Sequence, residues 1–93
     1  LDPVYGDAHY RMGIAFDSQN QGYNAISSLL IAEIIYHKTM KMGLFVNVQT
    51  KLKSLFEKYN TERKKFRNIR LPEMLKGYDI NQRRNQIRTS KEK

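Results

Sequence analysis

The chain contains no cysteine and no long hydrophobic run. Because thiols are absent, disulfide bonds, thiolate catalysis and cysteine-ligated metal sites are excluded. The longest largely apolar run, residues 25–36, is shorter than the about 20 residues that a transmembrane helix needs, and it contains Glu33. The first residues also lack the basic, then apolar, then small-residue order of a secretory signal. We therefore expect a soluble protein that is not secreted and works inside the cell, in the cytoplasm or the interior of an organelle.

Motifs that carry chemistry are scarce as well. His9 and His37 lie far apart and lack the spacing of a metal-binding pair on one helix. No phosphate-binding loop surrounds Gly13 or Gly22, and no serine stands in a nucleophile-elbow motif. The sequence therefore predicts a protein that is not an enzyme, with no catalytic residues, metal site, cofactor or small-molecule substrate.

Acidic residues are few in the C-terminal half. Residues 1–49 carry three Lys and Arg against four Asp and Glu, a net charge of −1, whereas residues 50–93 carry fourteen against five, a net charge of +9. The two halves together give the overall charge of +8. Such an asymmetric distribution favours an anionic partner for the C-terminal half, which could be RNA, an anionic membrane surface or an acidic protein.

The size of the chain limits its core. Its 93 residues, of which 40% are hydrophobic, suffice for one small domain but bury only a modest core. The sequence begins at Leu1 rather than at a methionine. We expect a fragment or subunit of a larger assembly.

Apolar periodicity predicts an all-α fold that starts with an antiparallel helical hairpin. Asp2 suits the N-cap of a first helix with Pro3 at its first position, and that helix should run to about Asp17. A polar turn, "DSQNQG", ends at Gly22. A second helix follows and should be largely buried, because apolar side chains recur there at helical spacing: Tyr23, Ile26, Leu30, Ile34 and His37.

A third, amphipathic and basic helix is predicted after the hairpin. Gly43 should stop the second helix, and Asn47 should cap the third. One apolar stripe is expected along the third helix, made of Val48, Leu52, Leu55, Phe56, Tyr59 and Phe66. This gives a three-helix segment over residues 1–67.

Two further segments follow the helices. Pro72 disfavours helical backbone for Leu71, so residues 68–80 should be extended and pack back on the helices. Residues 81–93 have little apolar content and form a basic tail that should be disordered unless bound.

Gly13 suggests close helix packing. A glycine inside a helix costs roughly 1 kcal/mol relative to alanine, so its retention implies a contact that needs no side chain. Small residues recur in the second helix at Ala25 and Ala32. We therefore predict that Gly13, Ala25 and Ala32 lie where the two helices cross. Alanine should be tolerated at position 13, whereas leucine should separate the helices.

This arrangement of small residues resembles the tetratricopeptide repeat, a helical hairpin with a small residue in its first helix and alanines in its second. Larger residues flank them here as in the repeat: Met12, Phe16, Leu29 and Tyr36. The chain departs from the repeat at His9, Asn20 and His37. Since one repeat cannot bury its face alone, the resemblance implies packing neighbours.

A longer stretch resembles the Bro domain of Alix-like endosomal-sorting adaptors, whose last helical hairpin is similar to "AHYRMGIAFDSQNQGYNAISSLLIAEI". In that family another helix and an extended segment with an aromatic residue and a proline follow. Here "LFVNVQTKLKSLFEKYN" and "KKFRNIRLPEML" stand in the same order, with Phe66, Arg70, Leu71, Pro72 and Glu73 at the corresponding places. The family's partner-binding patch lies in earlier helices, so the resemblance implies no binding residue in this chain.

Two basic clusters are the candidate binding residues, because arginine can make bidentate contacts to phosphates or carboxylates. The first cluster is Arg63, Lys64, Lys65, Arg67 and Arg70, and the second is Arg83, Arg84 and Arg88. The favoured hypothesis is a helical protein–protein interaction or scaffold module whose basic half contacts an acidic partner. The alternative is a ribonucleoprotein component, for example ribosome-associated, whose arginines contact the RNA backbone. Membrane binding by the third helix is less favoured, because its apolar stripe is needed to cover the second helix.

Overall fold

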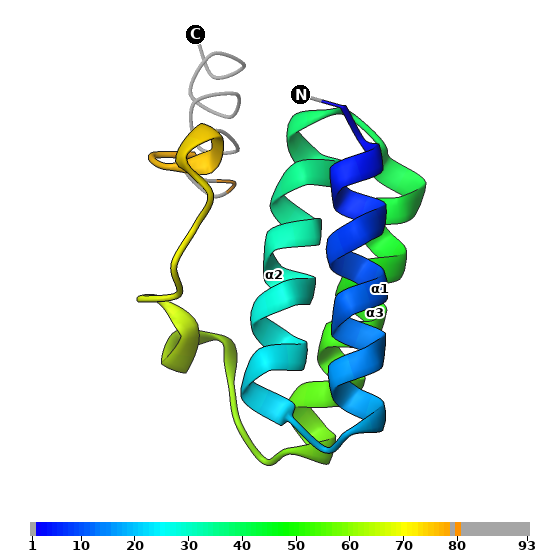
Figure 1. Cartoon of the computed structure of the whole chain (residues 1–93), viewed down its shortest axis with the longest axis vertical. Coiled ribbons are helices and arrows are strands. Elements are labelled where there is room, and N and C mark those ends of the chain that lie inside the picture. The colour runs from blue at the N-terminus through cyan, green and yellow to red at the C-terminus, as the bar shows by residue number, and fades with distance from the viewer. Residues whose placement is uncertain (1, 79, 81–93) are drawn as a thin grey trace, which may run out of the picture.

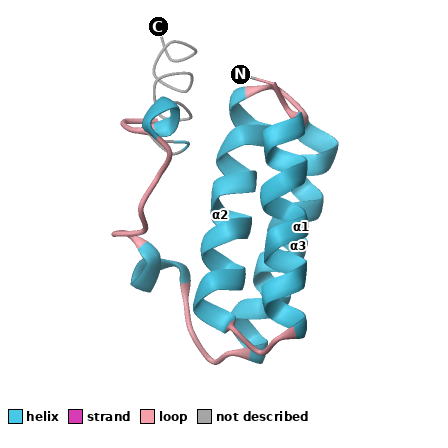
Figure 2. Cartoon of the chain, viewed as in Figure 1, coloured by secondary structure: helices cyan, strands magenta, loops and turns pink. Residues whose placement is uncertain are grey.

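The computed structural model describes residues 2–78 and residue 80, and this part of the chain is all-α. Three long helices are followed by two short 3₁₀ helices: α1 (Val4–Ser18), α2 (Gly22–Lys38), α3 (Met42–Lys58), η1 (Arg63–Phe66) and η2 (Glu73–Leu75). In Figure 1, α1 and α2 form an antiparallel hairpin and α3 packs behind it. Figure 2 shows that the helices are joined by short loops. The predicted all-α fold, with a hairpin and a third helix, is confirmed.

The start of α1 uses both residues that the sequence indicated, shifted by one position. The Asp2 side chain accepts a hydrogen bond from the Val4 N–H (3.0 Å). The Pro3 carbonyl accepts another from the Gly6 N–H (2.9 Å), so that Pro3 occupies the N-cap rather than the first helical position. Asp2 still satisfies an N–H group that the helix leaves unpaired. A difference of one residue is usual at helix ends.

All three helices end in the same way, with one residue of left-handed backbone. These residues are Asn20 (φ 59°), Met40 (φ 61°) and Asn60 (φ 51°). The residue after each one donates its N–H to the carbonyl five positions back; for example, Lys41 donates to Tyr36 (2.8 Å). This is the Schellman motif, which closes a helix and reverses the chain.

The predicted boundary between the second and third helices was wrong. Gly43 does not stop α2 but lies in the first turn of α3, and Asn47 lies within α3 instead of capping it. Because α2 is closed by the left-handed Met40, the chain reverses three residues before Gly43. Methionine rarely adopts left-handed backbone, so local propensity pointed to the glycine instead.

The core is built around α2. The fully buried side chains of this helix include Ile26, Leu29 and Ile35, and α3 contributes Val48, Leu52 and Leu55. The strong apolar periodicity of the second helix therefore corresponds to burial from several sides.

The sequence had predicted Phe66 as the last residue of the apolar stripe on the third helix, and this prediction was wrong. The helix ends at Lys58, and Phe66 belongs to η1. Its ring instead stacks on Tyr23 of α2, with the centroids 5.3 Å apart, and packs against Phe56 at 6.0 Å. The chain reversal after α3 makes this contact possible.

The residues after α3 return along α2, and we call residues 63–78 the strap (Figure 1). Leu75 is fully buried, and the Lys38 side chain donates a hydrogen bond to the Met74 carbonyl (3.0 Å). The hydroxyl of Tyr78 lies 2.5 Å from Nδ1 of His37. The segment expected to be extended thus lies against α2 and contains η2. Residues 81–93, the predicted disordered tail, lie outside the described residues.

Candidate functional site

Two of the three predicted helix-packing residues, Gly13 and Ala25, lie where α1 meets α2. Ala25 and Ala32 are fully buried on one face of α2. A Cβ atom placed on Gly13 would lie 2.8 Å from Cγ of Leu29 and 3.1 Å from the carbonyl oxygen of Ala25. Since real Cβ atoms do not approach so closely, even alanine at position 13 requires the neighbouring atoms to shift. The expectation that alanine is tolerated there is therefore corrected.

Gly6 is a second close contact that the sequence analysis missed. A Cβ atom on Gly6 would lie 2.7 Å from a ring carbon of Tyr36. Gly6 precedes Gly13 by seven residues, which places both on one face of α1, and Leu29 and Tyr36 are also seven residues apart on α2. The sequence therefore did contain a signal for this contact, namely the equal seven-residue spacings of the two glycines and of their two partners.

Side-chain hydrogen bonds connect α1 to its neighbouring helices at both ends of the hairpin. At one end, the buried Tyr36 donates a hydrogen bond to Asp7. The pKa of this tyrosine is raised mainly by its burial and, to a smaller extent, by the hydrogen bond. At the other end, Asp17 accepts hydrogen bonds from Lys58 Nζ and the Tyr59 hydroxyl, both at 2.7 Å. The hydrogen bond from Lys58 is the main reason why the pKa of Asp17 is lowered. Asp17 thereby links the end of α1 to the end of α3.

The first basic cluster divides into paired and unpaired side chains. Arg63 forms a bidentate ion pair with Glu33 of α2, with N–O distances of 2.7 and 3.0 Å, and the Glu33 residue is only 2% exposed. Arg63 was predicted to contact an outside anion but instead neutralises this buried carboxylate. Lys64 lies 3.3 Å from Glu62 in an exposed pair, which contributes little to stability.

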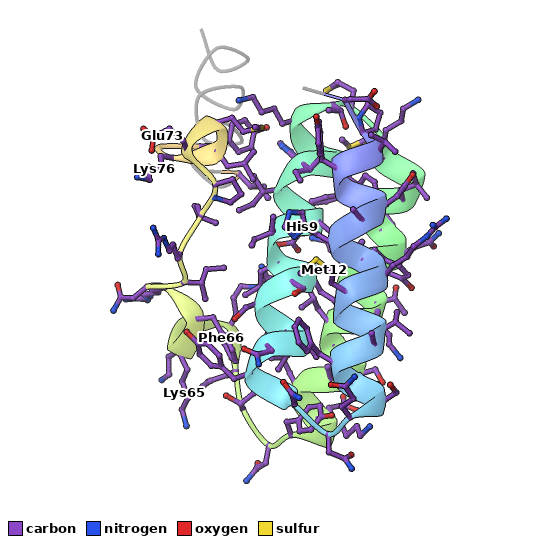
Figure 3. All side chains as sticks on the ribbon, viewed as in Figure 1. His9, Met12, Lys65, Phe66, Glu73 and Lys76 are labelled. Carbon is purple, nitrogen blue, oxygen red and sulfur yellow. The ribbon has the colours of Figure 1, made fainter. Side chains whose placement is uncertain are left out.

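The remaining cations of that cluster are Lys65, Arg67 and Arg70. They are exposed, and they form no ion pair with any residue in the described part of the chain. Figure 3 shows Lys65 directed away from α2, whereas the neighbouring Phe66 is directed toward it. The strap therefore buries Phe66 and Leu75 while these charges remain at the surface. The second cluster, Arg83, Arg84 and Arg88, lies outside the described residues.

A groove of about 480 Å³ runs between α2 and the strap. Its apolar walls are formed by Leu30 and Ile34 of α2 and by partly buried strap and C-terminal residues that include Ile69, Leu71 and Ile80. Among the described residues, its charged lining consists of Glu33, Arg63 and Arg67. Because Arg63 occupies both oxygens of Glu33, Arg67 carries the one charge in the lining that has no partner among the described residues. The groove is thus apolar with a positive edge.

The face of the hairpin that is turned away from α3 has few reactive side chains. Figure 3 shows His9 and Met12 between α1 and α2 on the face turned away from α3. Burial lowers the pKa of His9, and its Nδ1 has no hydrogen-bond partner within the described residues. No group of three or more His, Asp or Glu side chains suited to a metal ion occurs in that part of the chain. This face therefore offers no evident reactive site.

Comparison of the chain with protein-family models, with curated proteins and with solved structures gives no match. The resemblance to the tetratricopeptide repeat and the Bro domain therefore stays a prediction. Across residues 2–78 and 80, no helix is both long and apolar enough to cross a membrane. The groove and the exposed strap cations Lys65, Arg67 and Arg70 are therefore the features that indicate a function.

Proposed function

We propose that this chain is a non-enzymatic helical module for protein–protein interaction, a part of a larger assembly, and that it binds an acidic partner along the strap. The observation that carries this proposal is that Lys65, Arg67 and Arg70 are exposed on the strap without ion pairs among the described residues, and that Arg67 lines an apolar groove. Interfaces combine an apolar centre with a polar rim, and arginine is enriched in them. The bidentate pair of Arg63 with Glu33 helps to hold this surface in place.

RNA binding is the second candidate, because the same unpaired cations could contact phosphates. It ranks lower on two grounds. The apolar walls of the groove would find no matching surface along an RNA backbone. The ring of Tyr23, the most exposed aromatic among the described residues at 61%, is already stacked on Phe66 with one face.

Membrane-surface binding through α3 has the least support. An interfacial helix inserts its apolar face into the lipid. Here Leu52 and Leu55, at the centre of that face, are 0% and 1% exposed because they pack into the core. The large apolar side chains that α3 does expose, Met42, Leu44 and Val46, lie in its first turns rather than along the whole helix.

Capture with the immobilised full chain tests the proposal. The bait is offered lysate at about 50 mM and about 200 mM salt, with and without ribonuclease, because phosphate contacts weaken steeply over this range. We expect the same protein partners to be retained after ribonuclease treatment, and to be reduced when Lys65, Arg67 and Arg70 are all replaced by glutamine. A bound fraction consisting of RNA that disappears at the higher salt would contradict the proposal and support the second candidate.

A further inference from the structure

We infer that the groove between α2 and the strap binds an extended acidic peptide, in which an apolar side chain enters the groove and a neighbouring carboxylate pairs with Arg67. This inference rests on the proposed function and specifies the partner's chemistry. Four observations carry it: the size and apolar walls of the groove, the charge at its edge, the charge of the chain's own C-terminal residues, and two strap peptide groups that make no backbone hydrogen bond with a described residue.

The groove has the dimensions and lining of a site for side chains. Its volume of about 480 Å³ lies within the range of roughly 300–1,000 Å³ that is typical of ligand pockets. Ile34, Ile69 and Leu71 line it and are only partly buried, although they lie beside the core. Covering their remaining apolar surface would be favourable, because it removes that surface from water. An apolar side chain of a partner provides such cover.

Charge selects an acidic occupant. The one carboxylate that the described residues contribute to the lining belongs to Glu33, and both of its oxygens already accept hydrogen bonds from Arg63. Arg67, at the same groove, is exposed and has no ion pair within the described residues. Arg70 lies in sequence between Ile69 and Leu71, which both line the groove. Guanidinium groups suit carboxylates because they can donate two parallel hydrogen bonds.

The chain's own C-terminal residues do not match this charge. Residues 81–93 carry five Lys and Arg and one Glu, so they are as basic as the groove edge. Like charges brought together in a binding site oppose association. A segment of another protein that carries Asp or Glu is therefore the occupant that complements the groove.

The backbone of the strap favours an extended occupant over a helical one. Pro72 has extended backbone (φ −55°, ψ 148°). The peptide groups of Arg70 and Leu71 make no backbone hydrogen bond with any described residue. An extended peptide beside them could pair with these groups, as in β-strand addition, and place alternate side chains in the groove. The strap thus supplies main-chain partners and the groove supplies selectivity.

Selection from a phage-displayed library of random linear peptides, with the full chain as bait, tests this inference. We expect enriched peptides to carry Asp or Glu next to Leu, Ile or Phe. Binding of the best synthetic peptide should weaken roughly tenfold with Arg67→Glu, since one charge-assisted hydrogen bond is lost and a repulsion is added. Arg70→Glu provides the same test at the neighbouring position. Ile34→Ala should weaken binding through the apolar wall, without a change in charge.

Lys41→Glu is the matched control, because it makes the same charge change at an exposed position between α2 and α3 that does not line the groove. It should leave peptide affinity unchanged, and circular dichroism should show equal helix content in all variants. Enrichment of basic peptides, no enrichment at all, or equal affinities of Arg67→Glu, Arg70→Glu and Lys41→Glu would overturn the inference. If captured proteins are retained by Arg67→Glu as by the unchanged chain, the interaction function stands and the groove is not its site. Capture of RNA alone would overturn both.

Discussion

Replacing Gly13 by alanine should destabilise the protein, although alanine is the better helix former. The gain in helix propensity is roughly 1 kcal/mol. Against it, the new Cβ would lie 2.8 Å from two carbons of Leu29 and 3.1 Å from the Ala25 carbonyl, so that these atoms must move. Overpacking of this kind costs about 1–3 kcal/mol. The steric cost should exceed the propensity gain, which leaves a net loss of about 1 kcal/mol. For a domain of this size, such a loss lowers the melting temperature by roughly 4–8 °C.

Gly43 offers the matched control for this experiment. It also lies in a helix, but nothing stands within 4 Å of the position where its Cβ would be. Gly43→Ala should therefore stabilise by up to about 1 kcal/mol through propensity alone. Thermal and urea unfolding followed by circular dichroism would measure both variants. Equal stabilisation by the two alanines would refute the close-packing account of Gly13.

A double-mutant cycle would identify the contact that resists the added methyl group. In a Leu29→Ala background two of the clashing atoms are absent, so Gly13→Ala should become less costly there than in the unchanged protein. Leu29→Ala alone removes a fully buried side chain and should cost about 2–5 kcal/mol, so the cycle needs a stabilising osmolyte. Additive effects of the two changes would place the obstacle elsewhere.

The ion pairs of Arg63 with Glu33 and of Lys58 with Asp17 give further predictions. Arg63→Ala should lower the free energy of unfolding in urea by about 2–3 kcal/mol. This value lies between the costs of breaking a buried and an exposed ion pair, because Glu33 is 2% exposed whereas the Arg63 side chain is 53% exposed. Adding Glu33→Leu to that variant should restore most of the loss, and a further loss would contradict the pairing. For Asp17, the pKa lowered from 3.8 means that its stabilisation is present above that pH and is lost as the pH falls through the folded-state pKa. Asp17→Asn should therefore flatten the acid side of the stability profile, and an unchanged slope would show that its contacts with Lys58 and Tyr59 contribute nothing.

Local features of the chain account for most of the helices. Capping residues located the start of α1, apolar periodicity located α2, and the run of polar residues ending at Gly22 located their turn, because these signals depend on neighbours within a few residues. The end of α2 was misjudged because it depends on an unfavourable left-handed Met40. That conformation lets α3 begin at Met42, and the buried Phe45 and Val48 of α3 then belong to the core.

The candidate site depended on contacts between distant residues. Composition alone indicated a basic C-terminal half and an anionic partner, since charge is counted without coordinates. It did not indicate that Arg63 pairs with Glu33, thirty residues away, or that Lys65, Arg67 and Arg70 stay without an ion pair among the described residues. Nor could it show a groove whose walls come from α2 and from the returning strap. Amino-acid order sets helix periodicity and total charge through short-range physics, whereas the closeness of α2 and the strap arises only when the folded chain buries its apolar surface.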